Sequence, residues 1–228
     1  VGKMKFNAIV PFRKLSKGMI NKNFKKIAGI PLWQIAANQA TRTCDSLLIS
    51  TDATDNLSIE DDRNIIINMR PERLAKDSTK MSEVIHYLID EYHLIDENIV
   101  LLQPTSPLRT DKSIQQAMNL YESQNFSMVM SVVQKDSAVL KNGFLDGRSF
   151  RPINNISYCF ENRQSLPNIY GPNGSIYIFS AKNFMKNKDF PTDAIGTVIM
   201  DEIESLDIND KYDYEKAEEL FSNYHRKI

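Results

Sequence analysis

The sequence has little cysteine, and this limits the chemistry that thiols can supply. Its 228 residues include two cysteines, Cys44 and Cys159, which lie far apart and without the spacing of a metal-binding motif. We therefore expect two reduced, inert thiols rather than a zinc site or a disulfide framework. No apolar run approaches the roughly 18 residues of a membrane span, and the N-terminus lacks the apolar core of a signal peptide. These absences predict a soluble cytoplasmic protein with no membrane partner.

Acidic residues are missing from the beginning of the chain, where none precedes Asp45. Residues 1–44 carry nine Lys or Arg, whereas residues 193–219 carry ten Asp or Glu and two lysines. The formal net charge is nevertheless only −1, which argues against a nucleic-acid partner, because such proteins usually present a basic face. The two charged segments can meet in one site, where one holds an anion and the other a cation. The alternative is two solvated surfaces that attract each other weakly.

Apolar runs alternate with helical patterns along the first 133 residues. Strands are predicted at 6–11, 46–50, 64–68, 98–102 and 128–133, and helices at 31–40, 82–92 and 112–124, the last capped by Asp111. Such alternation is typical of an α/β fold with a mostly parallel sheet and helices on both faces.

The pattern changes from Gln134 to Pro172, where polar residues, prolines and asparagines interrupt the apolar runs. We interpret residues 134–172 as an extension of the domain, either a lid over the substrate or an arm that faces a partner. A strand is predicted again at 174–180 and a helix at 211–224.

Three polar segments end or follow predicted strands: residues 10–23, 50–52 and 103–109. Because ligands of open parallel sheets bind beyond the carboxyl ends of the strands, we expect these segments to form one site. The first of them contains Arg13, Lys17 and Lys22, which can neutralise phosphate charge. It contains neither a Walker motif nor GxGxxG, so phosphate binding and a plain basic surface loop both remain open at this point.

Six short motifs occur in a fixed order over nearly the whole chain. They are Arg13, Ser16, Lys17, Lys22 and Asn23 followed by Gly29-Ile30-Pro31-Leu32; Ser50-Thr51-Asp52; Arg70-Pro71-Glu72 with Asp77; LQPTSPLR from Leu102 to Arg109; NGSIYI from Asn173 to Ile178; and SLDIND from Ser205 to Asp210. In order and spacing they resemble the CMP-sugar synthetases, the cytidylyltransferases that activate sialic acid and related nonulosonic acids.

The resemblance implies a single Rossmann-like domain over residues 1–228, in which residues 134–172 help to form a homodimer. It also implies a reaction, in which the anomeric hydroxyl of an acidic 2-keto sugar attacks the α-phosphate of CTP and pyrophosphate leaves. Charge builds on phosphoryl oxygens in such a reaction, so positioning and electrostatics dominate its catalysis.

The resemblance also assigns roles to particular residues. Arg13 and Lys17 hold the triphosphate and act in catalysis; Ser16, Lys22 and Asn23 hold the nucleotide; Arg70 supports the cytosine side near Asp77 and Ser82; Gln103, Arg109 and Asn173 meet the sugar acid. Each of these roles is an expectation carried over from the family motifs.

The acidic end of the chain is expected to hold the metal, Mg²⁺ or Mn²⁺, because both prefer carboxylate oxygens. Asp207, placed after a predicted strand, is the expected ligand and a catalytic residue. The family usually has a second Asp where Asn209 stands here, so Asn209 is the second candidate ligand. Asp210 is expected to cap the last helix.

Two departures from the family pattern, Asn209 and the residue Leu15 in place of a usual glycine, leave other functions open. One alternative is a cytidylyltransferase for another acceptor, such as a Kdo-like sugar or a phosphonate. The other is a catalytically weak nucleotide-binding relative.

Overall fold

The computed structural model describes residues 4–14, 19–53, 57 and 64–225 of the chain. Its main element is a seven-stranded sheet in the order β11-β7-β10-β6-β1-β4-β5. The strands are β1 (Phe6–Pro11), β4 (Ser46–Thr51), β5 (Ile65–Met69), β6 (Asn98–Leu102), β7 (Met128–Lys135), β10 (Ile169–Ser180) and β11 (Ile195–Ile199). All neighbours are parallel except β10, which runs antiparallel to both β6 and β7.

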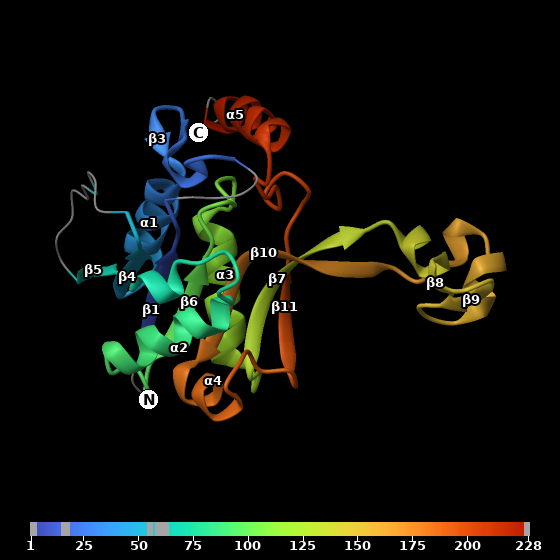
Figure 1. Cartoon of the computed structure of the whole chain (residues 1–228), viewed down its shortest axis with the longest axis horizontal. Helices are drawn as coiled ribbons and strands as arrows, with labels where there is room; N and C mark the ends of the chain where they lie inside the picture. Colours follow the sequence, from blue (N-terminus) through green and yellow to red (C-terminus); the bar gives the residue numbers. More distant parts are fainter. Residues whose placement is uncertain (1–3, 15–18, 54–56, 58–63, 226–228) are drawn as a thin grey trace.

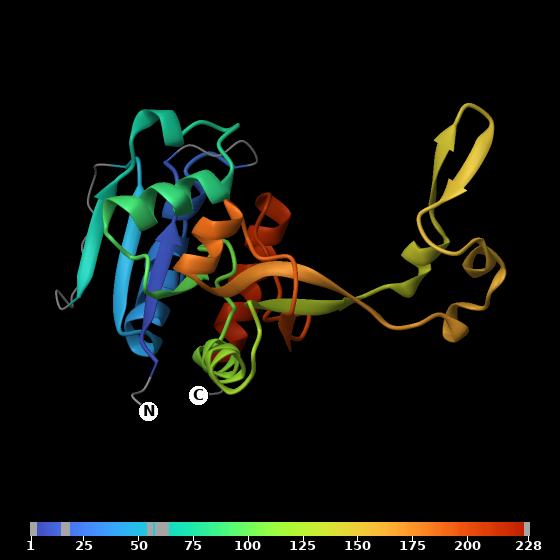
Figure 2. The same ribbon diagram turned by 90° about the horizontal axis from the view of Figure 1, so that it is seen from below.

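Helices cover both faces of this sheet (Figures 1 and 2). They are α1 (Leu32–Thr43), α2 (Met81–Glu91), α3 (Asp111–Ser123), α4 (Ala181–Asn187) and α5 (Lys211–His225). Strand residues alternate between the two faces: Ala8 and Val10 pack in the core with α1 and α3, whereas Ile9 packs with α2 and α4. The predicted α/β fold, mostly parallel and covered on both faces, is confirmed.

Two short hairpins complete the strands: β2 (Lys26–Ile27) with β3 (Ile30–Pro31), and β8 (Gly143–Asp146) with β9 (Ser149–Pro152). The second hairpin belongs to residues 136–168, which we call the arm. The arm leaves the sheet at the end of β7, returns at the start of β10 and projects away from the rest of the molecule (Figures 1 and 2). The interrupted pattern of 134–172 therefore marks a projecting segment, whose first and last residues continue the two strands.

Two details differ from the sequence-based expectations. The N-cap of α3 is Thr110, whose hydroxyl accepts the Ser113 N–H at 3.2 Å, and Asp111 is the first helical residue. A short hydroxyl serves as the cap here, while the Asp111 carboxylate forms an ion pair with Arg42. Asp207 was expected directly after a strand, but the strand that precedes it, β11, ends at Ile199 and is followed by a turn.

The cap expected at the last helix is confirmed. Asp210 Oδ1 accepts the Asp213 N–H at 3.0 Å, which satisfies one of the free donors in the first turn of α5. No described helix combines the length and the apolar character needed to cross a membrane.

Candidate functional site

A cavity of about 200 Å³ lies beyond the carboxyl ends of β1, β5 and β6. It is lined by Pro11, Phe12, Arg13, Lys22, Asn23, Arg70, Met81, Gln103, Pro104 and Thr105. Because parallel strands of one sheet end at the same edge, residues from three of the six motifs meet there. We call this the edge cavity. Arg13, Lys22, Asn23, Arg70 and Gln103, all expected at the site, are among the residues that the structure brings together.

Arg13 enters the edge cavity directly after β1 and is held from two sides. Its Nη1 donates to Asp77 Oδ1 at 2.8 Å and to the Ala75 carbonyl at 3.3 Å. Asn23, which is buried, donates from Nδ2 to the Arg13 carbonyl at 3.1 Å. The side chain of Arg13 is thus oriented by the segment after β5, while its backbone is fixed by the opening loop.

Arg70 supplies a second, more deeply buried cation. Its Nε donates to Ser50 Oγ at 3.2 Å and its Nη2 donates to the Ser50 carbonyl at 2.8 Å. Burial lowers the pKa of the Arg70 guanidinium to about 10, against the opposite influence of Asp52. A guanidinium that is bound by neutral oxygens retains its positive charge for an anion in the cavity.

Lys22 connects the basic opening loop to the acidic end of the chain. It begins the short 3₁₀ helix η1 (Lys22–Phe24), and its Nζ donates to the Ile208 carbonyl at 2.7 Å. Burial lowers the pKa of Lys22, while the carboxylates of Asp207 and Asp213 act to raise it. The two charged segments noted in the sequence therefore meet across this lysine.

The segment of residues 205–210, which we call the acidic loop, offers the carboxylate of Asp207 with the amide of Asn209 beside it. Asn209 Nδ2 donates to Asp207 Oδ2 at 3.1 Å, and the Asn209 backbone N–H donates to Asp213 Oδ2 at 2.9 Å. Among the described residues, no three His, Cys, Asp or Glu side chains gather as a metal-ligand cluster. A single carboxylate nevertheless fits Mg²⁺, because this ion is often held by one or two carboxylates together with substrate phosphates.

Three of the residues expected at the site, Ser16, Lys17 and Ser82, are not found in the edge cavity. Ser16 and Lys17 fall outside the described residues, as does Leu15. Ser82 lines a separate depression on the outer side of α2, together with Arg73 and His86, whereas its neighbour Met81 lines the edge cavity. The helix start therefore turns Met81, and not Ser82, toward the site.

Arg109 is buried behind the edge cavity, with 2% of its surface exposed. Its Nη1 donates to the Ser175 carbonyl at 2.7 Å and to the Gln103 carbonyl at 3.2 Å, and its Nη2 donates to Gln39 Oε1 at 2.8 Å. Burial lowers the pKa of this guanidinium to about 9. Arg109 thus joins α1, β10 and the loop that carries Gln103.

Asn173 is also buried, at the register shift in β10. Its Oδ1 accepts from Ser131 Oγ at 2.5 Å, and its Nδ2 donates to Ser205 Oγ at 2.9 Å. The amide therefore ties β7 and β10 to the turn that precedes Asp207. Its contacts position the acidic loop.

One member of this arrangement, Gln39, was not expected from the sequence. It lies on α1, and its Nε2 donates to the Arg109 carbonyl while its Oε1 accepts from the Arg109 side chain. A glutamine in an amphipathic helix resembles an ordinary surface residue. Only the burial of Gln39, with 5% exposed, distinguishes it.

Replacing Gln39 by alanine is expected to destabilise the protein, because Arg109 Nη2 then loses its acceptor inside the core. The expected loss is about 1–3 kcal/mol of unfolding free energy, the usual cost of a buried donor left unpaired. Urea unfolding measures it, with Gln115→Ala as the matched control, since Gln115 is an exposed glutamine on α3. Equal stability of both variants would contradict a supporting role for Gln39.

The fold and the site together define an α/β protein that can hold an anion at the carboxyl edge of its sheet. Residues 7–146 match the family model described as Cytidylyltransferase, and the chain belongs to that family. The motifs that pointed to cytidylyltransferases in the sequence are thus supported by an independent comparison.

Two curated relatives extend this similarity over most of the chain. One is the N-acylneuraminate cytidylyltransferase of Escherichia coli O18:K1:H7, with 31% identity over 98% of this chain and 56% of the relative. The other is the CMP-N,N'-diacetyllegionaminic acid synthase of Legionella pneumophila, with 30% identity over 95% of this chain and 96% of the relative. The chain therefore spans about half of the first relative and nearly all of the second.

Solved structures share the fold at low identity. A structure of CMP:2-keto-3-deoxy-manno-octonic acid synthetase complexed with CTP covers 96% of this chain at a TM-score of 0.68 and 12% identity, and 99% of that chain is covered. A 4-diphosphocytidyl-2C-methyl-D-erythritol synthase covers 96% at a TM-score of 0.61 and 10% identity, with 100% of that chain covered. Both similarities concern the fold.

Proposed function

We propose that the protein transfers the cytidylyl group of CTP to an acidic nonulosonic sugar, giving the CMP-sugar and pyrophosphate. The observation that carries this proposal is the edge cavity, which is lined by Arg13, Lys22 and Arg70 and which is connected through Lys22 to the loop that carries Asp207. The family membership and the two curated relatives named above support the same substrate class.

In this reaction an oxygen of the acceptor sugar forms a bond to the α-phosphorus of CTP. The bond from that phosphorus to the bridging oxygen breaks, pyrophosphate leaves with the electron pair, and the acceptor hydroxyl loses its proton to solvent. Negative charge increases on the leaving group, where fixed cations stabilise it most. Arg13 and Arg70 fill this role in the edge cavity, and Lys17 is proposed to join them from the opening loop.

Asp207 is proposed to hold Mg²⁺, or Mn²⁺, together with the phosphates of CTP. The metal would neutralise charge on the triphosphate. Asn209 offers its amide oxygen as a second ligand if the side chain turns over, since its Nδ2 now contacts Asp207. Lys22 keeps the acidic loop next to the nucleotide through the Ile208 carbonyl.

Gln103 is proposed to contact the acceptor sugar, because it lines the edge cavity at the end of β6. Arg109 and Asn173 receive positioning roles instead, since both side chains are buried among protein oxygens. Asn23 and Asp77 orient Arg13, and thereby the phosphate side of the cavity. Met81 takes the cavity position that Ser82 was expected to occupy.

The arm supports a homodimer as part of the proposal. Its apolar side chains are unusually exposed, with Leu145 at 78%, Phe160 at 84% and Phe144 at 60%. Exposed apolar side chains that gather on one projecting segment mark a protein interface.

The free cysteines and the substrate CTP agree with a cytoplasmic location.

Replacing both Leu145 and Phe160 by serine is expected to convert a dimer into a monomer, because each change removes a large apolar contact from the arm interface. Light scattering after gel filtration measures the mass. Ile199→Ser is the control, since Ile199 is 62% exposed on the edge strand β11, outside the arm. A monomeric parent chain, or a dimer that persists in the double variant, would overturn this assembly.

The proposed activity is tested by pyrophosphate release from CTP and Mg²⁺ with a panel of nonulosonic acids, Kdo and a phosphonate. The expected result is turnover with a nonulosonic acid and its loss in Lys17→Ala. Turnover only with Kdo or the phosphonate would reassign the acceptor. Binding of CTP without turnover on any acceptor would identify a catalytically weak relative.

A further inference from the structure

The last helix, α5, packs on a small apolar core of its own, apart from the two cores that flank the sheet. We call this the α5 core. Figure 1 shows α5 beside the hairpin of β2 and β3, which follows the opening loop. The α5 core joins this hairpin to α1, the acidic loop and α5. Its buried members are Ile27, Leu32, Ile35, Leu108, Ile208, Ala217 and Phe221.

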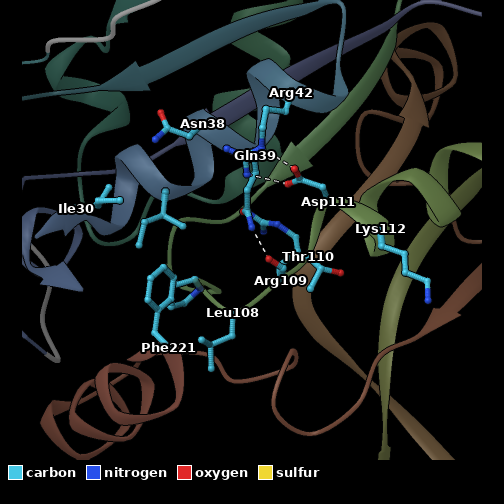
Figure 3. Close-up of a pocket in the computed structure, with 12 residues that line it drawn as sticks. Ile30, Asn38, Gln39, Arg42, Leu108, Arg109, Thr110, Asp111, Lys112 and Phe221 are labelled. Atoms are coloured by element: carbon cyan, nitrogen blue, oxygen red, sulfur yellow. Dashed lines mark hydrogen bonds and ion pairs between the residues drawn. The ribbon is translucent and has the colours of Figure 1, made fainter. Parts of the chain in front are cut away.

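The apolar packing of α5 is incomplete. A cavity of about 410 Å³ lies between α5, α1 and the loop of residues 107–110, and Figure 3 shows Ile30, Leu108 and Phe221 around it. An apolar side chain that faces a cavity loses contacts on that side, so it restrains its neighbours less. The position of α5 therefore depends on polar contacts as well as on its apolar side chains.

Two hydrogen bonds connect the start of α5 and the acidic loop to the segment of residues 22–26. Tyr214 Oη donates to the Lys26 carbonyl at 2.6 Å, and Lys22 Nζ donates to the Ile208 carbonyl at 2.7 Å. The ammonium of Lys25 lies 5.5 Å from the centroid of the Tyr214 ring, a distance at which a cation is attracted to the ring face. The basic and acidic segments are thus joined at two points, one of which is Tyr214.

The hydroxyl of Tyr214 does what its ring cannot do alone. The ring is partly buried against the α5 core, a place that a phenylalanine ring would fill equally well. The hydroxyl reaches the backbone of β2, four residues after Lys22. Lys22 lines the edge cavity, and a lysine side chain has many rotamers. It keeps one direction most readily when its backbone is fixed relative to the Ile208 carbonyl that it contacts.

We propose that Tyr214 is a positioning residue of the nucleotide site, an inference that rests on the function proposed above. By tying β2 to α5, its hydroxyl holds Lys22 against the acidic loop. The Lys22 ammonium and the Asp207 carboxylate are thereby presented to CTP in a fixed arrangement. Without this bond the two segments have to be ordered when CTP binds, which lowers the affinity.

The experiment measures CTP binding to the full chain by calorimetry, with Mg²⁺ and without an acceptor, so that no turnover is required. Tyr214→Phe is expected to weaken CTP binding about threefold to tenfold, the usual scale for one neutral hydrogen bond. Tyr212→Phe is the matched control, because Tyr212 lies two residues earlier in α5 and is 71% exposed. Its CTP affinity should equal that of the parent chain.

A second comparison separates a role through Lys22 from a general loss of stability. In a Lys22→Gln background, Tyr214→Phe should leave CTP affinity almost unchanged, because residues that act through one another have non-additive effects. Additive losses, or equal CTP affinity in Tyr214→Phe and the parent chain, would each overturn the inference while the proposed function stands. Failure of the parent chain to bind CTP would overturn both, so the two failures are distinguishable.

Discussion

Replacing Asp207 by asparagine is expected to lower metal-dependent turnover by about a hundredfold or more. Asp207 is the proposed metal ligand, and Asn209 next to it carries no charge, so the variant loses the carboxylate on which the metal site depends. Pyrophosphate release measured over a series of Mg²⁺ and Mn²⁺ concentrations checks this. The same measurement should show a large rise in the metal concentration that gives half-maximal rate.

The matched control for Asp207→Asn is Asp210→Asn, three residues further on. Asp210 caps α5, and asparagine caps helices about as well as aspartate, so this variant should fold and turn over normally. A further variant, Asn209→Asp, should lower the metal requirement by adding a second carboxylate. If Asp207→Asn turns over within about threefold of the parent protein, Asp207 is not a metal ligand, and the metal is held by the phosphates of CTP without it.

The variant Arg13→Gln is expected to lower kcat/KM by about a hundredfold to a thousandfold, the usual effect of removing one donor that stabilises developing charge. Arg13 lines the edge cavity and is oriented by Asp77 and by the Ala75 carbonyl, so it is presented to an incoming phosphate in a fixed direction. Pyrophosphate release with CTP and the sugar acid measures the effect.

Arg73→Gln is the control for Arg13→Gln. Arg73 precedes Ala75 and Asp77 in the same segment of the chain. Its guanidinium carbon, however, lies over the Tyr87 ring, 5.7 Å from the ring centroid, and the residue lines the depression that also contains Ser82. Its loss should leave kcat/KM within about twofold, because an exposed charge outside the cavity contributes little. A similar loss in both variants would show that general positive charge, and not the position of Arg13, supports the reaction.

The strands that cross the centre of the sheet were predictable because both of their faces are buried. β1 and β6 occur at the bounds expected from their apolar runs, Phe6–Pro11 and Asn98–Leu102. β11 was not predicted because it lies at an edge of the sheet, where buried residues alternate with exposed ones and one of the buried residues is a glycine. The short helix α4 has only two buried residues, Ala181 and Phe184, so it gives no extended helical pattern.

The residues of the edge cavity follow from strand order, because each lies just beyond the end of a parallel strand. The direction of a side chain in a loop does not follow in this way. Arg109 ends the same motif that contains Gln103, yet the loop turns its guanidinium inward to Gln39 and Ser175. Gln39 lies 70 residues before Arg109 along the chain, so their contact depends on the packing of α1 against the loop.

The antiparallel strand β10 has a consequence for the order in which the protein is made. It is inserted between β6 and β7, and the outer partner of β7, β11, follows later still. While the chain is synthesised from its N-terminus, β7 has no neighbour in the sheet until residues 169–199 emerge, and β6 has one open edge for as long. Open strand edges pair readily with other chains. A nascent chain that stops in the arm therefore leaves the ribosome with β7 unpaired and one edge of β6 open, and rapid completion of residues 169–199 protects it.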